Sequence, residues 1–296
     1  MYSISVIIPT YNRKDSVINA IKSVESQTVK PSEIIVVDDG STDDTSKIVQ
    51  GLSSTIRYIQ INHSGIPGKV RNVGIYQSSG DYIAFLDSDD IWLPEKLETQ
   101  IKLLDTYSNI GILCSNALIQ EPCLNPAYQK YLSIESKYGN VFHSLVNNNF
   151  IITSTVLIKR EILENIGYFS EENYLIGIED YDLWLRIAIK YNVLYKDQVL
   201  AIYLKHDKQI SKTKTRVNYW RDLENLYKKI YQQLEKDACF EDKHVLSFAI
   251  KRCQIRIFNE FLKEKKYYNS TLFLMRHPYL LLEIPFVIRK RYLRQR

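Results

Sequence analysis

Short apolar runs alternate with helix-like segments over the first part of the chain. The runs are rich in β-branched or aromatic residues and lie at residues 4–9, 33–38, 56–61 and 81–86. Such runs are typical of strands that are buried on both faces. Apolar residues recur at helical spacing, or helix start and stop signals occur, over residues 14–27, 43–52, 67–78 and 95–106. The alternation predicts an α/β fold in which a mostly parallel sheet is flanked by helices and joined by right-handed crossovers.

The pattern changes twice further along the chain. Residues 107–203 are less regular, with strand-like pieces at 111–119 and 154–158 and a helix near 180–191. Beyond about residue 212 the chain is helical in pattern and rich in Lys, Arg and Tyr. We therefore expect one domain over residues 1–211 and a helical, basic region over residues 212–296.

Charge divides the chain in the same way. The net charge of +5 combines 17 Lys and Arg against 24 Asp and Glu in residues 1–204 with 22 against 10 in residues 205–296. The hydrophobic content of 45% and the charged content of 25% are ordinary for a soluble globular protein. The four cysteines form no CxxC pair, and neither a spanning helix nor a signal peptide is visible. These features favour a cytoplasmic protein with reduced thiols.

Three polar clusters follow predicted strands. TYNR follows the first strand, DDGSTDD the second and DSDD the fourth. Because parallel strands present their carboxyl ends at one edge of a sheet, we expect the clusters to line one ligand crevice.

The last cluster offers ligands for a divalent metal ion. Asp87, Ser88 and Asp89 supply hard oxygen atoms that suit Mg²⁺ or Mn²⁺ together with substrate phosphates. No glycine-rich phosphate loop occurs, so Arg71 is the candidate cation for a diphosphate. The alternative is that DSDD forms a turn and caps the next helix.

Five ordered motifs resemble those of the family 2 glycosyltransferases, which are inverting enzymes of the GT-A fold. The motifs are SVIIPTYNR, VVDDGSTDDT, KVRNVGI, GDYIAFLDSDDIWLP and IEDYDLWLR. The resemblance spans roughly residues 3–211 and leaves the C-terminal 85 residues outside it. It implies transfer of a sugar from a nucleotide-sugar, most simply a UDP-sugar, to a glycan or lipid-linked acceptor.

The resemblance implies roles for residues on the donor side. Pro9, Thr10 and Tyr11 would line the nucleotide pocket, and Asp39 would hydrogen-bond a uracil-like base. Arg71 would contact the diphosphate. Asp87 would face the ribose, and Asp89 would ligate the metal ion.

On the acceptor side, Asp180 would be the catalytic base, with Glu179 beside it. A base far from the metal cluster in the chain suits an in-line displacement, because the acceptor hydroxyl and the leaving group lie on opposite faces of the sugar. His206 would contact the metal ion or the diphosphate. The alternative for Glu179 and Asp180 is stabilisation of the dipole of the helix that they begin.

Two other functions stay open on the sequence alone. A phosphatase with an aspartyl nucleophile would place such a residue after a strand, as in FLDSDD, and a non-catalytic module would bind a nucleotide-sugar without turnover.

The tail from Leu272 onward mixes apolar residues with a basic end, RKRYLRQR. This composition favours binding in the plane of an anionic membrane, which would make the enzyme peripheral on the inner face of the plasma membrane. The alternative is a helical extension packed on the body. No nucleic-acid recognition motif accompanies the tail, so a nucleic-acid partner is not expected.

Overall fold

The computed structural model describes residues 2–52, 55–107, 109–120, 129–205, 214–234 and 240–280. The chain separates into two compact units, residues 1–209 and residues 210–296. The first unit is an α/β structure, and the described part of the second is helical.

The described part of the first unit contains strands, α-helices and two 3₁₀ helices. In chain order they are β1 (Ile4–Thr10), α1 (Lys14–Glu25), β2 (Glu33–Asp38), α2 (Thr45–Leu52), β3 (Ile56–Gln60), α3 (Pro67–Gln77), β4 (Tyr82–Phe85), β5 (Ile91–Trp92), α4 (Lys96–Thr106), β6 (Ile110–Gln120), β7 (Gln129–Lys130), β8 (Lys137–Gly139), α5 (Phe142–Asn147), η1 (Thr153–Thr155), β9 (Leu157–Lys159), α6 (Arg160–Ile166), η2 (Asn173–Leu175), α7 (Glu179–Lys190) and β10 (Asn192–Leu204).

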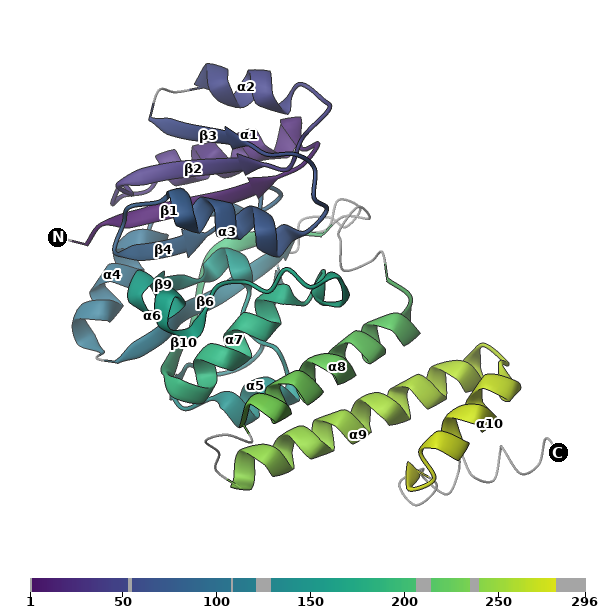
Figure 1. The fold of residues 1–296 in the computed structure, drawn as a ribbon. Coiled ribbons are helices and arrows are strands. Elements are labelled where there is room, and N and C mark those ends of the chain that lie inside the picture. The colour runs from purple at the N-terminus through teal and green to yellow at the C-terminus, as the bar shows by residue number, and fades with distance from the viewer. Residues whose placement is uncertain are drawn as a thin grey trace. The chain divides into compact units, whose positions relative to one another are not determined.

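One sheet runs through this unit in the order β3-β2-β1-β4-β9-β6-β10-β5 (Figure 1). The pairs among β1 to β4 are parallel, as is β6 with β10, whereas β9 pairs antiparallel with both β4 and β6. The chain moves outward from β1 to β3 and returns to β4 on the other side of β1. The strand order therefore reverses between β1 and β4, the place where open α/β sheets bind ligands.

Helices cover both faces of the parallel strands, and β2 shows how the sequence directs this. Its residues Ile34 and Val36 belong to the core cluster that includes Ile21 of α1. Ile35 and Val37 point the other way and pack with Val70 of α3. Successive side chains of a strand point to opposite faces, so a continuous apolar run needs a partner on each side.

The α/β architecture expected from the sequence is confirmed. All four early strands form within a residue of their expected ends, and the antiparallel pairs of β9 make the sheet mixed beyond β4. The long strand β10 was not expected. Its polar middle, Lys196 to Gln198, coincides with shifts of register against β6, and that irregularity breaks the periodic pattern of a strand. The piece at 154–158 forms a 3₁₀ turn before only three residues of strand.

The second unit contains α8 (Arg216–Leu234), α9 (Phe240–Lys263) and α10 (Tyr267–Arg276). Helices α8 and α9 run side by side in opposite directions, and α10 packs on α9 (Figure 1). Val217, Ile257 and Phe261 form one buried apolar cluster of this unit, and Phe258, Leu274 and Leu280 form another. Among the described residues, no helix combines the length and apolar character that crossing a membrane requires.

Close packing of α3 on the sheet gives a first testable prediction. A Cβ atom at Gly74 would lie 2.5 Å from Cγ2 of Ile7, which is closer than real side chains approach. We expect Gly74→Ala to lower the free energy of unfolding by about 1–3 kcal/mol, measured by urea denaturation. Gly51→Ala in α2 is the matched control, because a Cβ atom there meets nothing within 4 Å. We expect it to be neutral or to stabilise by up to about 1 kcal/mol. Equal stabilities of the two variants would contradict this account of the packing.

Candidate active site

The carboxyl ends of β1, β2 and β4 bring the predicted polar clusters to one edge of the sheet. Thr10 ends β1, Asp38 ends β2, and the backbone N–H of Asp39 donates to the carbonyl oxygen of Thr10 across 2.9 Å. Pro9 is half-buried in β1, whereas the ring of Tyr11 is exposed. The hydroxyl of Thr10 is buried and makes no hydrogen bond within the described part of the chain. A buried hydroxyl in that state is a place where a ligand atom gains a partner.

A buried ion-pair network connects α3, the end of β4 and the start of α7. The guanidinium of Arg71 donates to Oδ1 of Asp87 across 2.7 Å and to Oε1 of Glu179 across 2.8 Å. Burial works against the charge of Arg71, but Asp87 and Glu179 outweigh burial and raise its pKa. The other carboxylate oxygen of Glu179 accepts from the backbone N–H of Gly177 across 2.6 Å. Arg71 thus holds together two carboxylates, one of which lies 108 positions further along the chain.

Asp180 follows Glu179 in the first turn of α7 and has its own partner. The hydroxyl of Thr153, in η1, donates to Oδ2 of Asp180 across 2.7 Å. Burial, followed by the charge of Glu179, raises the pKa of Asp180 to about 6. Tyr131 lies within electrostatic reach, since burial and then the charge of Asp180 raise the pKa of its phenol. A carboxylate with this pKa is ionised at neutral pH and is a stronger base than an ordinary Asp.

The three acids of DSDD have different surroundings. Asp87 pairs with Arg71, and a guanidinium nitrogen of Arg13 lies 3.3 Å from Oδ2 of Asp89. Asp90 is buried and accepts hydrogen bonds from the hydroxyl of Ser154 and from the backbone N–H of Leu204. Burial, reinforced by the charges of Asp87 and Asp89, raises the pKa of Asp90 well above its usual value. Asp90 therefore has a structural position, and only the other two acids keep part of their side chains exposed.

These two partly exposed carboxylates suit a divalent cation. Mg²⁺ and Mn²⁺ take hard oxygen ligands, and Mg²⁺ is commonly held by one or two carboxylates whose coordination the substrate phosphates complete. Within the described residues there is no group of three or more His, Cys, Asp and Glu side chains that could hold a metal ion alone. Ser88 between them is buried. His206, the further expected ligand, lies outside the described residues.

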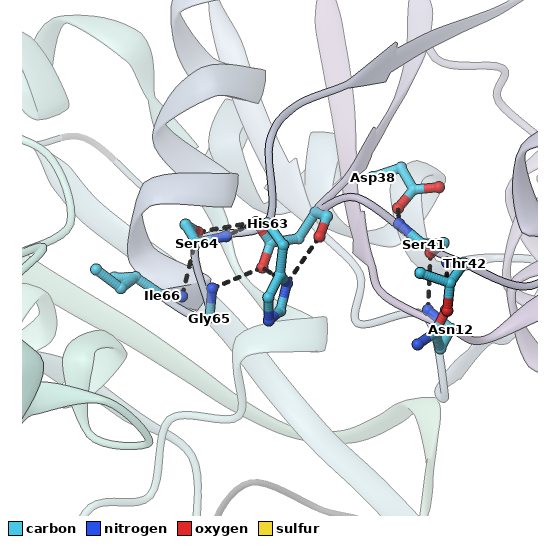
Figure 2. A network of polar contacts seen from close by, with 9 residues as sticks. Asn12, Asp38, Ser41, Thr42, His63, Ser64, Gly65 and Ile66 are labelled. Carbon is cyan, nitrogen blue, oxygen red and sulfur yellow. Dashed lines mark hydrogen bonds and ion pairs between the residues drawn. The ribbon is translucent and has the colours of Figure 1, made fainter.

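Asp39 is held by the loop that follows β3. Its carboxylate accepts from the backbone N–H groups of Ser64 and Gly65 across 2.8 and 2.9 Å, and Nδ1 of His63 lies 3.0 Å away. Figure 2 shows His63, Ser64 and Gly65 in this network. The ring of His63 also stacks on Tyr11, with ring centroids 4.2 Å apart. His63 thus contacts both the ring of Tyr11 and the buried carboxylate of Asp39.

Asp38 and the turn after it form the second part of that network. The carboxylate of Asp38 accepts from the backbone N–H of Ser41 across 2.8 Å, and the amide oxygen of Asn12 accepts from the backbone N–H of Thr42 (Figure 2). Gly40 has a φ of +74°, and a Cβ atom there would lie 2.8 Å from the backbone nitrogen of His63. Only glycine fits this position without strain.

Sequence reasoning missed three residues of the site. Thr153 holds Asp180, Ser154 holds Asp90, and Arg13 approaches Asp89. The polar triplet Thr153 to Thr155 inside the apolar stretch FIITSTVLI was a usable signal, because such a run invites hydrogen-bond partners. Arg13 was visible in TYNR, but nothing in the sequence indicates which acid it approaches.

Comparison with known proteins identifies the family. The family model described as "Glycosyl transferase family 2" matches residues 5–167, just over half of the chain. An uncharacterized glycosyltransferase of Rickettsia prowazekii is 31% identical over 243 residues, which cover 79% of this chain and 73% of that protein. A longer Rickettsia felis glycosyltransferase is 38% identical over 203 residues, 67% of this chain and 32% of its own length. The Escherichia coli protein WfaP, named UDP-Glc:alpha-D-GlcNAc-diphosphoundecaprenol beta-1,3-glucosyltransferase, is 36% identical over 201 residues, 64% of this chain and 72% of that protein.

Solved structures share the fold. Staphylococcus aureus TarS 1–349 in complex with UDP-GlcNAc superposes with a TM-score of 0.66 at 22% identity, covering 87% of this chain and 73% of that one. The mannosyltransferase PcManGT of Pyrobaculum calidifontis, in complex with GDP-Man and Mn²⁺, has a TM-score of 0.61 at 16% identity, covering 95% and 83%. At such identities the likeness shows the fold alone. The family match and the similarity to the Rickettsia prowazekii protein go further: the chain belongs to glycosyl transferase family 2 and is a glycosyltransferase with the GT-A fold.

Proposed function

We propose that this glycosyltransferase moves a sugar, with inversion, from a UDP-sugar to a saccharide or lipid-linked saccharide acceptor in the synthesis of a surface glycan. The observation that carries the proposal is the buried bridge of Arg71 between Asp87 and Glu179. It joins the acids on the donor side to the turn that contains Asp180. An inverting transfer needs these two sides at one site, because the hydroxyl that the base deprotonates attacks the carbon atom from which the nucleoside diphosphate leaves.

On the donor side, Pro9, Thr10 and Tyr11 would line the nucleotide pocket. The buried, unpartnered hydroxyl of Thr10 and the exposed ring of Tyr11 support this placement. Asp39 would face the base, and its carboxylate is already oriented by two backbone N–H groups. A preoriented acceptor loses little freedom when it binds a base that presents an N–H, as uracil does.

A divalent ion, Mn²⁺ or Mg²⁺, would bind beside the diphosphate. Its ligands would be Asp87 and Asp89, with Ser88 between them in the chain and His206 as a further ligand. The carboxylates of Asp87 and Asp89 support this proposal, because they are partly exposed and offer the hard oxygen atoms that such an ion prefers. When bound, such an ion neutralises the negative charge that develops on the departing UDP. Arg71 and Arg13 add positive charge beside the same acids.

On the acceptor side, Asp180 would accept the proton of the attacking hydroxyl. Thr153 orients its carboxylate, and burial keeps it basic enough to compete for that proton. Glu179 would act through its position: it keeps Arg71 in place and raises the pKa of its neighbour. A lipid-linked acceptor, as named for WfaP, fits an enzyme that is peripheral on the inner face of the plasma membrane, with residues 212–296 as the membrane-associating region.

A panel of nucleotides tests the donor assignment. We expect UDP with Mn²⁺ to raise the melting temperature, because a ligand at 100 times its dissociation constant stabilises the native state by about 2.7 kcal/mol. UDP without metal, and GDP with metal, should raise it much less. Asp89→Ala should abolish the effect of Mn²⁺ while the protein without ligand melts near the parent temperature, since Asp89 is partly exposed.

Incubation with UDP-sugars and an undecaprenyl-diphosphate saccharide then tests transfer. Formation of an extended lipid-linked product supports the proposal. A preference for GDP, or UDP binding without turnover of any donor and acceptor, would overturn it.

A further inference from the structure

The C-terminal unit contains a groove of about 450 Å³ where the first turn of α8, the last turns of α9 and helix α10 meet. Its apolar floor includes Val217, Phe261 and Phe273. Arg221, Lys266 and Arg276 contribute cationic side chains to the lining. The groove is therefore shaped for a ligand with an anionic and an apolar part.

Within the described residues, an acid neutralises only one of the three cations of the groove. Glu264 is the acid of the lining, and it pairs with Lys266 across 2.6 Å. Neither Arg221 nor Arg276 pairs with a carboxylate of the described residues. The guanidinium of Arg221 lies 5.8 Å from the ring centroid of Phe261 instead. Two arginine forks that line one groove suit the oxygens of a phosphate group.

A stripe of exposed apolar side chains borders the groove. Tyr268, Leu272 and Met275 of α10 are 76%, 37% and 74% exposed, and they stand at positions i, i+4 and i+7, on one face of the helix. Ser270 and Leu274, on the opposite face, are buried. Leu272 also lines the groove, so stripe and groove are continuous. A helix that packs one face and exposes apolar residues on the other has the form of an interfacial helix.

We propose that the groove binds the phosphate of an anionic membrane lipid while the stripe of α10 enters the bilayer interface. The inference rests on the proposed membrane-peripheral location and names the residues that would produce it. A soluble phosphate would explain the arginines but leave the stripe exposed to water. Residues 281–296 carry five Lys and Arg and a single Glu, so their net charge has the same sign as the cations of the groove. A lipid satisfies both features, since its phosphate and its acyl chains are joined in one molecule.

Vesicle flotation of the full chain tests the polar half of the proposal. We expect binding to phosphatidylcholine vesicles that contain phosphatidylglycerol and little binding to phosphatidylcholine alone. Arg221→Gln with Arg276→Gln should lower the partition coefficient about 25-fold, since each basic residue near an anionic surface contributes about fivefold. The matched control is Lys243→Gln with Lys251→Gln, which removes the same charge from α9; Lys243 lies about 27 Å along the helix from Phe261. An equal loss in the control pair would mean diffuse attraction without a site and would overturn the proposal.

The apolar half has its own variants. Tyr268→Ser with Met275→Ser should weaken binding to anionic vesicles severalfold, because both side chains lose contact with the acyl boundary. Phe248→Ser removes an apolar side chain of α9 that is 58% exposed, and it should leave binding unchanged. Unchanged binding of the double variant would overturn the proposal. Two further results would overturn the proposal. The first is a dimer of the parent protein in sedimentation that is absent in the double variant, because the stripe would then pack on a second copy. The second is displacement of vesicles by an oligonucleotide that binds the same arginines.

Failure of this inference and failure of the proposed function are distinguishable. The melting-temperature shift with UDP and Mn²⁺ involves residues of the first unit, and all vesicle variants should retain it. If the parent protein floats with anionic vesicles but its melting temperature does not rise with UDP and Mn²⁺, only the donor assignment is wrong. If UDP and Mn²⁺ raise the melting temperature of the parent protein but the groove variants float as well as the parent, only the lipid site is wrong.

Discussion

Asp180→Asn is expected to remove nearly all transfer activity, lowering kcat by about 10²–10⁴-fold. The amide keeps the size and one hydrogen-bond acceptor of the carboxylate, so the hydroxyl of Thr153 keeps its partner. It cannot accept the proton of the acceptor hydroxyl, and general-base catalysis supplies a factor of this size. The UDP response should be unchanged. The free energy of unfolding should not fall, since burial of the Asp180 carboxylate is unfavourable.

The pH profile gives this prediction a second readout. Because the base acts in its ionised form and its pKa is about 6, the rate should rise with pH through about 6 and then level off. Thr153→Val removes a hydrogen bond that lowers the pKa of Asp180. The acidic limb should therefore move to higher pH while the plateau rate stays close to that of the parent protein. A shift to lower pH would contradict the assignment.

Asp182→Asn is the matched control for Asp180→Asn, because the same substitution is made two residues later in α7. Asp182 is fully buried and pairs with Arg186 across 2.8 Å, away from Arg71 and Thr153. Loss of this carboxylate leaves the guanidinium of Arg186 with a weaker partner. The free energy of unfolding should therefore fall by at most about 3–5 kcal/mol. The rate of each folded molecule should not fall. If Asp182→Asn loses transfer as completely as Asp180→Asn, the acids of this turn act through the fold of α7 and Asp180 is not the base.

The sequence predicted the part of the site that depends on chain topology. Because buried strands have continuous apolar runs and parallel strands end at a shared edge, the sequence predicts that Thr10, Asp39 and Asp87 lie at one edge of the sheet. The resemblance of five motifs to family 2 glycosyltransferases implies a donor site at the same edge of the sheet. The family match leaves the aspartyl phosphatase without support, and Asp87, its candidate nucleophile, is paired with Arg71.

The sequence does not indicate which charged and polar side chains pair with one another. Arg71 was expected to meet a diphosphate, yet its guanidinium already holds two carboxylates, one of them 108 positions away. Asp38 and Asp39 are both bonded to residues of β3 or of the loop after it, and nothing in the sequence indicates these partners. Periodicity reports which face of an element is buried, whereas such pairs depend on how distant elements are placed. The roles of these residues in binding and catalysis stay predictions.

Arg71→Leu is expected to damage stability and transfer together. The leucine leaves Glu179 buried beside Asp87 without a cation, and breaking a buried ion pair in this way costs about 3–5 kcal/mol. Transfer should fall at least tenfold further in the molecules that remain folded, since positive charge near the leaving group is lost. Urea denaturation and initial rates at saturating UDP-sugar separate the two effects.

The double variant Arg71→Leu with Glu179→Gln distinguishes a structural role from a catalytic one. Removing the charge of Glu179 relieves the unpaired carboxylate, so part of the lost stability should return, and the cycle of single and double variants measures the coupling of the pair. Transfer should not return, because no cation is restored near Asp87. Arg186→Leu, which breaks the buried pair with Asp182, should lose comparable stability but keep the rate of each folded molecule. Recovery of transfer along with stability in the double variant would mean that Arg71 only fastens α3 to α7, and the charge on the leaving group would then have to be met by Arg13 and the metal ion alone.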